Sequence, residues 1–182
     1  MNVVNVTRLA TLGGGCFWCT QAVFSQLRGV ASSRCGFSGG ALPDPTYHQV
    51  CAGATGHAEV VQLVYDPAEI SYRDLLEVFF QTHDPTTLDK QGHDIGSQYR
   101  SVIFYHDVVQ RELARTAIDQ LQQSGIFSSP IVTQLLPFKV FYVAEEEHQD
   151  YFAKHPTQPY CVSTVRAKVE KCREYFAEQL RS

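Results

Sequence analysis

The chain has 182 residues, of which 44% are hydrophobic and 19% are charged, and its formal net charge is −4. A chain of this length and composition can bury a core of its own, so we expect one domain over residues 1–182. No patch is basic enough to favour nucleic acid as a partner, and no apolar run is long enough to cross a membrane.

The N-terminus and the six cysteines bear on the cellular compartment. The first twelve residues lack a charged region followed by an apolar run, so we expect no secretory signal. Without a signal, six cysteines in such a chain are typical of free thiols in a reducing environment. We therefore expect a cytoplasmic protein.

The first elements alternate between strand and helix. Val3–Leu12 is rich in β-branched and apolar residues, which predicts a strand, and a helix from Cys16 to about Leu27 follows it. A second strand is expected near Val30–Phe37. A long loop rich in glycine, proline and polar residues then occupies Ser38 to Gly56.

The next elements complete a recognisable order. His57–Tyr65 alternates as a strand, and Ser71 can cap a helix that runs to about Thr82. A second long polar loop, Asp84 to Gln98, leads to a strand at Ser101–Tyr105. The order β-α-β-β-α-β predicts an α+β protein, a two-layer sandwich with a ferredoxin-like core.

The rest of the chain adds extra helices and two short strands. Asp107 can cap a helix to Gln123. Two strands joined across Pro137 are expected at Ile131–Leu136 and Lys139–Val143. A short helix over 145–154 and a C-terminal helix over 162–180 end the chain.

Cys16 lies where a glycine-rich turn meets the start of a helix, in Gly-Gly-Gly-Cys-Phe-Trp-Cys at 13–19. Free N–H groups and the positive end of the helix dipole favour the thiolate there. Phe17 and Trp18, the only tryptophan, offer an apolar wall beside the sulfur. The alternatives are an inert buried cysteine, or half of a zinc site with Cys19, but no second pair follows at ligand spacing.

The two long loops bring polar groups that suit chemistry at an oxygen atom. The first delivers Tyr47 and leads to Glu59, and the second delivers Asp94 and Tyr99. A carboxyl group with two phenols can hold and protonate an oxygen. Taken singly, each of these residues is more often an ordinary surface or half-buried residue.

A family resemblance that extends in order from about residue 10 to residue 170 is carried by seven stretches. They are Gly15-Cys16-Phe17-Trp18, Gly36-Phe37-Ser38-Gly39-Gly40, Tyr47, Thr55-Gly56-His57-Ala58-Glu59-Val60-Val61, His83-Asp84-Pro85-Thr86-Thr87, Gln91–Ser101 and Glu145–Tyr151. Together they closely resemble the peptide methionine sulfoxide reductases of the A type.

The resemblance implies a reaction and a first set of roles. Cys16 matches the family nucleophile, and Phe17 and Trp18 match the pocket for the substrate methyl group. The implied activity is reduction of methionine S-sulfoxide, free and in proteins, to methionine, with a sulfenic acid left on Cys16. It implies no metal and no organic cofactor.

The resemblance also implies how the sulfoxide oxygen is handled. Glu59 matches the acid that protonates or hydrogen-bonds this oxygen, with Tyr47 and Tyr99 as neighbouring donors. Asp94 matches a residue that organises the site, in the family through water. Because a sulfoxide sulfur is a poor electrophile until its oxygen is protonated, an acid facing the thiolate is required.

A second cysteine is expected to convert the sulfenic acid to a disulfide, which a thioredoxin-like donor reduces. Cys161 is favoured, because it lies in the C-terminal segment (about 156–182) on a presumed loop, and many family members place a recycling cysteine in such a Tyr-Cys segment. Cys19, one helical turn from Cys16, is a serious alternative, and Cys172 could relay the disulfide outward.

Two other functions stay open at this point. One is a metal-binding module built on Cys16, Cys19 and histidines. The other is a general thiol–disulfide oxidoreductase, which is disfavoured because it would not need Glu59. We expect a monomer, structural roles for His57, His148 and Cys35, and no assigned role for Cys51.

Overall fold

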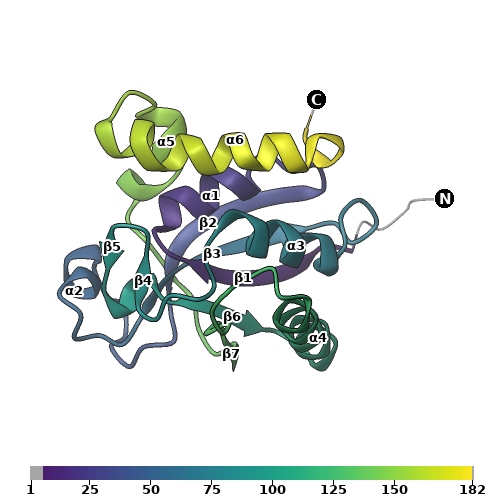
Figure 1. Cartoon of the computed structure of the whole chain (residues 1–182). Coiled ribbons are helices and arrows are strands. Elements are labelled where there is room, and N and C mark those ends of the chain that lie inside the picture. Colours follow the sequence, from purple (N-terminus) through teal and green to yellow (C-terminus); the bar gives the residue numbers. More distant parts are fainter. Residues whose placement is uncertain (1–5, 182) are drawn as a thin grey trace.

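The computed structural model describes residues 6–181, so residues 3–5 of the first expected strand lie outside the described part. One sheet forms the centre of the molecule, with helices α1 (Phe17–Phe24) and α3 (Tyr72–Thr82) against one face. Helix α6 (Arg166–Tyr175) packs across α1 (Figure 1). The expected α+β class is confirmed.

The sheet is built on four antiparallel neighbours. Strand β1 (Arg8–Gly14) pairs with β3 (Ala58–Tyr65) on one side and β6 (Ser101–Tyr105) on the other. Strand β2 (Val30–Ser38) pairs with the far side of β3. The complete order is β7-β6-β1-β3-β2-β8. Helix α1 therefore connects β1 to β2, with β3 between them in the sheet, and α3 lies on the connection from β3 to β6, with β1 between them.

Two short strands extend the sheet at its opposite edges. Strand β7 (Gln134–Pro137) lies parallel to β6, and β8 (Tyr142–Val143) lies antiparallel to β2. Both expected strands are present, but each begins later than expected, Pro137 belongs to β7, and the two strands do not pair with each other. The reason is that Phe138 and Phe141, between the two strands, pack on the second face of the sheet, so the chain crosses that face.

The main core lies between the sheet and the helices. Leu12, Phe37 and Leu63 from the sheet and Phe24 and Phe79 from the helices are all fully buried. In α1 every residue except Trp18 is buried, because the helix is covered by the sheet on one side and by α6 on the other. This placement fixes the start of α1, where the cysteine motif lies.

Helices with clear capping residues have the expected bounds. The Ser71 hydroxyl accepts the N–H of Asp74, and the Asp74 carboxylate accepts the N–H of Ser71, so a capping box begins α3. Asp107 caps α4 (Val108–Ser124), which lies beside β6 and ends at Gly125 in the left-handed conformation.

Other segments differ from the expectation. The first loop contains α2 (Tyr47–Cys51), and the second contains the hairpin β4 (Lys90–Gln91) and β5 (Asp94–Ile95) and the turn η1 (Ser97–Tyr99). A further helix expected over 145–154 is split at Asp150, whose φ is 53°. Its parts are η2 (Glu146–His148) and α5 (Tyr151–Lys154).

The C-terminal helix is also interrupted. A π-helical turn, η3 (Cys161–Val165), precedes α6, and a separate short turn, η4 (Ala177–Gln179), follows it. The expected helix over 162–180 therefore begins earlier, with Pro159 and Tyr160 already helical, and its regular part ends at Tyr175. Within residues 6–181, no helix combines the length and the apolar character needed to traverse a lipid bilayer.

Candidate active site

Cys16 is the N-cap residue of α1, directly after the glycine turn that ends β1. Its carbonyl accepts the N–H of Cys19 at 3.1 Å, and its side chain is only 7% exposed. The turn needs glycine at Gly15, whose φ is 98° and where a Cβ atom would strike the side chain of Gln91. The predicted strand–turn–helix setting of Cys16 is confirmed.

The protonation of Cys16 differs from the expectation. Burial raises the pKa of the Cys16 thiol well above its usual value, and a hydrogen bond with Cys19 and the charge of Glu59 act in the same direction. The predicted tendency toward thiolate is therefore wrong for this state, because desolvation outweighs the helix dipole. The thiol of Cys16 is protonated at rest.

Glu59 lies on β3, with its side chain only 1% exposed. One carboxyl oxygen, Oε2, accepts the backbone N–H of Phe17 at 3.0 Å, while Oε1 is buried and has no hydrogen-bond partner within the described chain. Burial raises the pKa of this carboxyl group to about 8, against the lowering effect of the Phe17 hydrogen bond. At neutral pH Glu59 therefore carries a proton that it could donate.

The two predicted phenols come to the same place from different elements. Tyr47 is the first residue of α2, and Tyr99 ends η1. Burial raises the pKa of both hydroxyl groups, and the charge of Glu59 is the next contribution for each. Both phenols are therefore protonated donors near Glu59.

Asp94 is held by a hydrogen bond from Tyr160, a residue to which the sequence analysis gave no role. The hydroxyl of Tyr160 donates a hydrogen bond to Asp94 Oδ2 at 2.6 Å and lies 3.8 Å from Cys19 Sγ. The ring of Tyr160 also meets Trp18 edge-on, with centroids 5.9 Å apart. Apart from its position next to Cys161, no feature of the sequence distinguished Tyr160 from the other tyrosines.

The rings around Phe17 and Trp18 form an aromatic wall, which we define as Phe17, Trp18, Tyr47, His148 and Tyr151. Trp18 and Tyr151 stack nearly parallel, 8° apart with centroids at 3.9 Å, and Tyr47 and His148 lie 4.2 Å apart. Phe17 is buried at 6.1 Å from Tyr47. Tyr151, like Tyr160, was missed at the sequence level.

The two histidines of the family-like motifs differ in how they are held. His57 accepts the N–H of Gly40 at 3.0 Å and bonds the carbonyl of Leu42 at 2.7 Å, which confirms its expected structural role. Neither ring nitrogen of His148 has a hydrogen-bond partner in the described chain, and burial lowers its pKa. The prediction of structural hydrogen bonding is wrong for His148, which acts as a neutral ring in the aromatic wall.

The candidates for the cysteine that forms a disulfide with Cys16 lie in different parts of the core. Cys161 is fully buried in one apolar cluster with Cys16 and Cys19. It begins the π-helical turn, so the expected position on a loop is wrong. Cys172 is buried in the main core instead, apart from that cluster. All six cysteines are free thiols.

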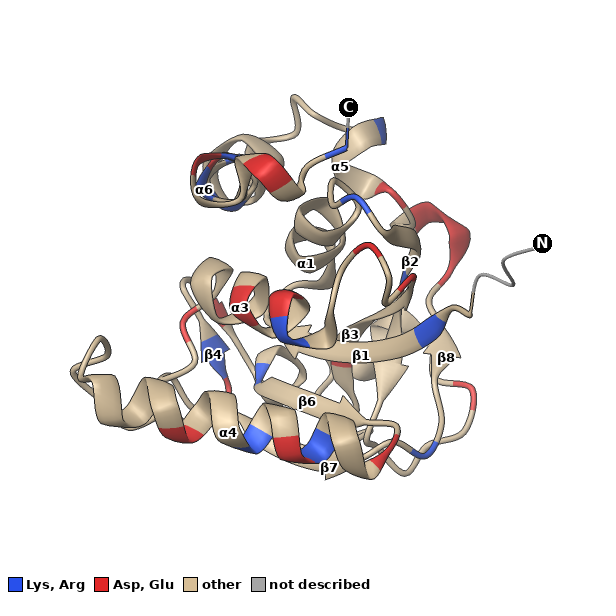
Figure 2. Cartoon of the chain, turned by 90° about the vertical axis from the view of Figure 1, so that its right-hand side faces the viewer, with Lys and Arg blue, Asp and Glu red and all other residues tan. Residues whose placement is uncertain are grey.

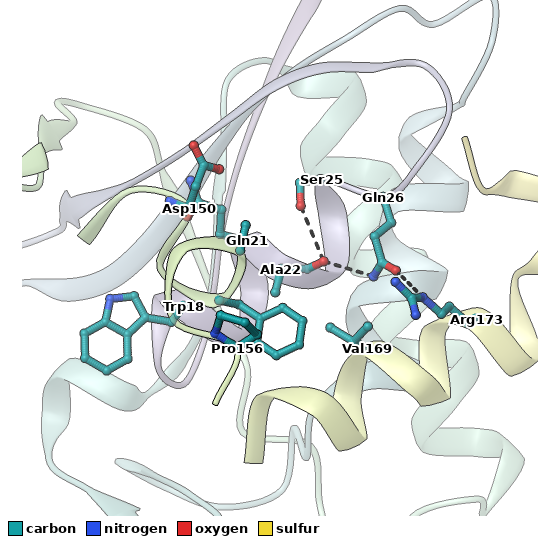
Figure 3. Close-up of a pocket in the computed structure, with 11 residues that line it drawn as sticks. Trp18, Gln21, Ala22, Ser25, Gln26, Asp150, Pro156, Val169 and Arg173 are labelled. Atoms are coloured by element: carbon teal, nitrogen blue, oxygen red, sulfur yellow. Dashed lines mark hydrogen bonds between the residues drawn. The ribbon is translucent and has the colours of Figure 1, made fainter. Parts of the chain in front are cut away.

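A groove of about 280 Å³ begins at Trp18 and follows α1 toward Arg173 on α6 (Figure 3). Its floor includes Ala22 and Val169, which belong to the same cluster as Cys16. Within residues 6–181, no three histidine, cysteine or acidic side chains are placed to hold a metal ion. The metal-binding alternative therefore finds no ligand set in that part of the chain.

Comparisons with known proteins give one consistent family. The family model described as peptide methionine sulfoxide reductase matches residues 8–180. The chain is 53% identical over 177 residues to the peptide methionine sulfoxide reductase MsrA of Natronomonas pharaonis, covering 97% of this chain and 99% of the relative.

Solved structures agree with this result. Methionine sulfoxide reductase A of Corynebacterium diphtheriae superimposes with a TM-score of 0.80 at 34% identity, covering 84% of this chain and 76% of that one. Mxr1 from Saccharomyces cerevisiae in complex with Trx2 gives a TM-score of 0.55 at 27% identity, covering 80% and 84%.

We predict that Glu59 makes the stability of the fold depend on pH. Its pKa is raised from 4.5 to about 8, so the folded chain holds a proton that the unfolded chain releases between these values. Stability is then lost as the pH rises through about 8. Glu59→Gln should exceed the wild type in unfolding free energy by on the order of 2–4 kcal/mol at pH 9 and match it at pH 4.

Urea unfolding at pH 4, 6 and 9 measures this difference. Glu174→Gln, at an exposed position on α6, is the matched control and should follow the wild type at every pH. Parallel curves for Glu59→Gln and the wild type would show that Glu59 is ionised in the folded chain.

Proposed function

This chain belongs to the peptide methionine sulfoxide reductase family, and from that premise we propose that it reduces methionine S-sulfoxide, free and in proteins, through a sulfenic acid on Cys16. As a member of the family it is an oxidoreductase, a thioredoxin-dependent peptide-methionine (S)-S-oxide reductase. The observation that carries the mechanism is the buried, unpartnered Oε1 of Glu59, on a carboxyl group whose pKa is about 8.

In the proposed reaction Glu59 acts on the sulfoxide oxygen. A protonated carboxyl group with one free buried oxygen can donate to that oxygen, and the hydroxyl groups of Tyr47 and Tyr99 are further donors near it. Protonation makes the sulfoxide sulfur electrophilic. Asp94, held by Tyr160, limits where the oxygen can lie.

Cys16 then takes the oxygen. Its sulfur attacks the activated sulfoxide, the sulfur–oxygen bond of the substrate breaks, and methionine leaves as the thioether. The oxygen moves from the methionine sulfur to the Cys16 sulfur with the proton that Glu59 gave it, and the thiol proton of Cys16 passes to the Glu59 carboxylate, so that a thiol and a sulfoxide become a sulfenic acid and a thioether and the acid is restored. Cys16 is oxidised by two electrons, and the methionine sulfur is reduced by two.

The aromatic wall suits the methyl group of the substrate. Phe17 and Trp18 follow Cys16 directly, and the neutral ring of His148 and the ring of Tyr47 extend the apolar surface. A methyl group held against these rings would direct the sulfur toward Cys16. This arrangement favours methyl sulfoxides over larger ones.

A second cysteine regenerates the enzyme in this proposal. The Cys161 thiol attacks the Cys16 sulfenic sulfur, water leaves, and a disulfide forms, which a thioredoxin-like dithiol reduces by exchange. The burial of Cys161 in the cluster of Cys16 supports this choice. Cys19, hydrogen-bonded to Cys16, is the alternative, and Cys172 is a possible later relay because it lies in a separate cluster.

The proposal also covers the type of core, the cellular compartment and the oligomeric state of the chain. The strand order β6-β1-β3-β2 supports a ferredoxin-like core for the single domain. Figure 2 shows basic and acidic residues interspersed along α4, which does not favour nucleic acid as a partner, and the proposal is completed by a cytoplasmic monomer. No cofactor is needed for the steps described.

We predict that Cys16→Ser abolishes turnover, because a serine hydroxyl is a far weaker nucleophile at neutral pH. The assay measures reduction of separated methionine sulfoxide epimers with dithiothreitol, and the wild type should use only the S epimer. Cys51→Ser, at a partly exposed position on α2, is the control and should keep its activity. A Cys16→Ser enzyme with about a tenth or more of wild-type activity would contradict the assignment.

Glu59→Gln separates this function from general thiol–disulfide exchange. The amide keeps the shape of the side chain but has no carboxylic proton, so we predict a roughly 10²–10⁴-fold slower single-turnover formation of methionine. Reduction of the preformed disulfide by dithiothreitol should be unchanged. An unaltered single-turnover rate would remove Glu59 from the mechanism.

For recycling, we predict that Cys161→Ser leaves a trappable sulfenic acid on Cys16 after one equivalent of sulfoxide without reductant. Cys19→Ser should still form the disulfide between Cys16 and Cys161, and Cys172→Ser should do the same. Disulfide mapping by mass spectrometry gives the result. A normal disulfide between Cys16 and Cys19 in the Cys161→Ser enzyme would assign the role to Cys19.

A further inference from the structure

Two rings of the aromatic wall lie on a segment that has almost no regular structure. His148 ends the short turn η2, and Tyr151 begins the four-residue helix α5. Between them Asp150 has the left-handed conformation, with φ 53°, so no helix runs through the segment. Secondary structure alone therefore does not fix where these two rings lie.

His148 in particular has no hydrogen bond of its own to hold it. Both of its ring nitrogens are buried without a hydrogen-bond partner in the described chain, and the carboxylate of Glu147 is 3.7 Å away. Its ring nevertheless lies 4.2 Å from that of Tyr47 and 5.8 Å from that of Trp18. The backbone that carries the ring must be held in place by another group.

That group is the amide of Gln149, which pairs with the main chain of β2 as a strand residue would. Its Oε1 accepts the N–H of Cys35 at 2.9 Å, and its Nε2 donates to the carbonyl of Cys35 at 2.9 Å and to that of Ala144 at 3.1 Å. Strand β8 ends at Val143, so the amide continues the pairing of the β2 edge after the strand has ended.

Gln21 of α1 completes the network from the other side. Its Nε2 donates to Gln149 Oε1 at 3.3 Å and to the carbonyl of Ser33 at 2.9 Å. Its Oε1 accepts the N–H of Asp150 at 2.8 Å and the thiol of Cys35 at 3.3 Å. Figure 3 shows Gln21 and Asp150 side by side near Trp18. Every polar atom of both amides is thus bonded, and both side chains are at least 95% buried.

We propose that Gln149 and Gln21 are positioning residues that hold His148 and Tyr151 against Trp18 and so set the affinity of the enzyme for the sulfoxide. The proposal rests on the proposed function, because it assigns the wall to substrate binding. Neither amide contacts the reacting groups directly. They act by fixing the segment 148–151 to β2, which carries Cys35, and to α1, which carries Trp18.

The aromatic wall and the reacting groups are expected to affect different kinetic constants, KM and kcat. The wall binds the methyl group in the ground state and in the transition state alike, whereas Glu59 and the thiol of Cys16 act on the chemical step. Loss of the network should therefore raise KM more than it lowers kcat. Glu59 keeps its hydrogen bond to Phe17, since neither glutamine takes part in it.

The test uses Gln149→Met and Gln21→Met, which keep the length of the side chain and remove its four hydrogen bonds. For a peptide methionine sulfoxide we expect KM to rise about tenfold in each, with kcat within about threefold of the wild type. Because Trp18 is the only tryptophan, acrylamide quenching of its fluorescence reports on the wall directly. Quenching should increase in both variants as Tyr151 leaves the indole face.

Gln110→Met is the matched control. Gln110 on α4 is also buried, and its amide bonds the carbonyl of Leu9 at 2.7 Å and the N–H of His106 at 3.0 Å. This variant should lower the urea midpoint without changing KM or quenching. In a Tyr151→Ala background, Gln149→Met should raise KM by less than it does alone, because the two residues act through one contact.

The proposal is overturned if both Gln→Met variants keep the wild-type KM and quenching, or if Gln110→Met changes them equally. Should Gln149→Met fail to fold, Gln21→Met decides the question. A wild-type enzyme without sulfoxide reductase activity would refute the proposed function instead. The quenching measurement would still show whether the amides hold the wall.

Discussion

The hydrogen bond from the backbone N–H of Phe17 to Glu59 is the interaction on which the site depends. It joins the centre of the sheet to the first turn of α1, and it satisfies one of the N–H groups that a helix start leaves unpaired. It uses only one carboxyl oxygen. The other oxygen is buried without a hydrogen-bond partner in the described chain, so a sulfoxide oxygen placed there could accept the carboxylic proton.

Burial then decides the charge state of the whole centre. Burial raises the pKa of both Glu59 and Cys16, and the charge of Glu59 raises that of Cys16 further, because two negative charges would repel in this medium. At rest Cys16 is therefore a thiol and Glu59 a carboxylic acid, whereas the hydrogen bond with Cys16 lowers the pKa of the neighbouring Cys19 thiol to about 7. In the proposed reaction both protons are in place before the sulfoxide arrives, and the sulfoxide oxygen is the group that receives one.

Sequence patterns predicted the parts of the fold that local interactions determine. The capping residues Ser71 and Asp107 and the alternating strand before Tyr65 gave bounds within a residue or two of the structure. The pairing of β7 and β8 could not be predicted, because it depends on Phe138 and Phe141 packing across the second face of the sheet. The break at Asp150 likewise depends on Gln149 bonding to a strand more than a hundred residues away.

The same division applies to the site. Cys16 is recognisable because its glycine turn and its helix are neighbours in sequence, and Glu59, Tyr47, Asp94 and Tyr99 lie in motifs. Its protonation was mispredicted, since the degree of burial is a property of the assembled core and not of the turn. Tyr151 and Tyr160 were missed because only the fold brings the C-terminal third of the chain to Trp18.

The C-terminal third must meet two opposite requirements in the proposed cycle, and it meets them in separate segments. The wall needs a fixed backbone, which the amides of Gln149 and Gln21 supply over 148–151. Disulfide formation needs the Cys161 thiol to reach the Cys16 sulfur, and Cys161 directly follows Tyr160, whose hydroxyl donates to Asp94. Cys161 begins a π-helical turn, whose hydrogen bonding is less favourable than that of an α-helix, so rearrangement there costs less than in α6. The fixed segment 148–151 and the segment that must move at Cys161 are thus neighbours in the chain, and Trp18 contacts both, through Tyr151 and Tyr160.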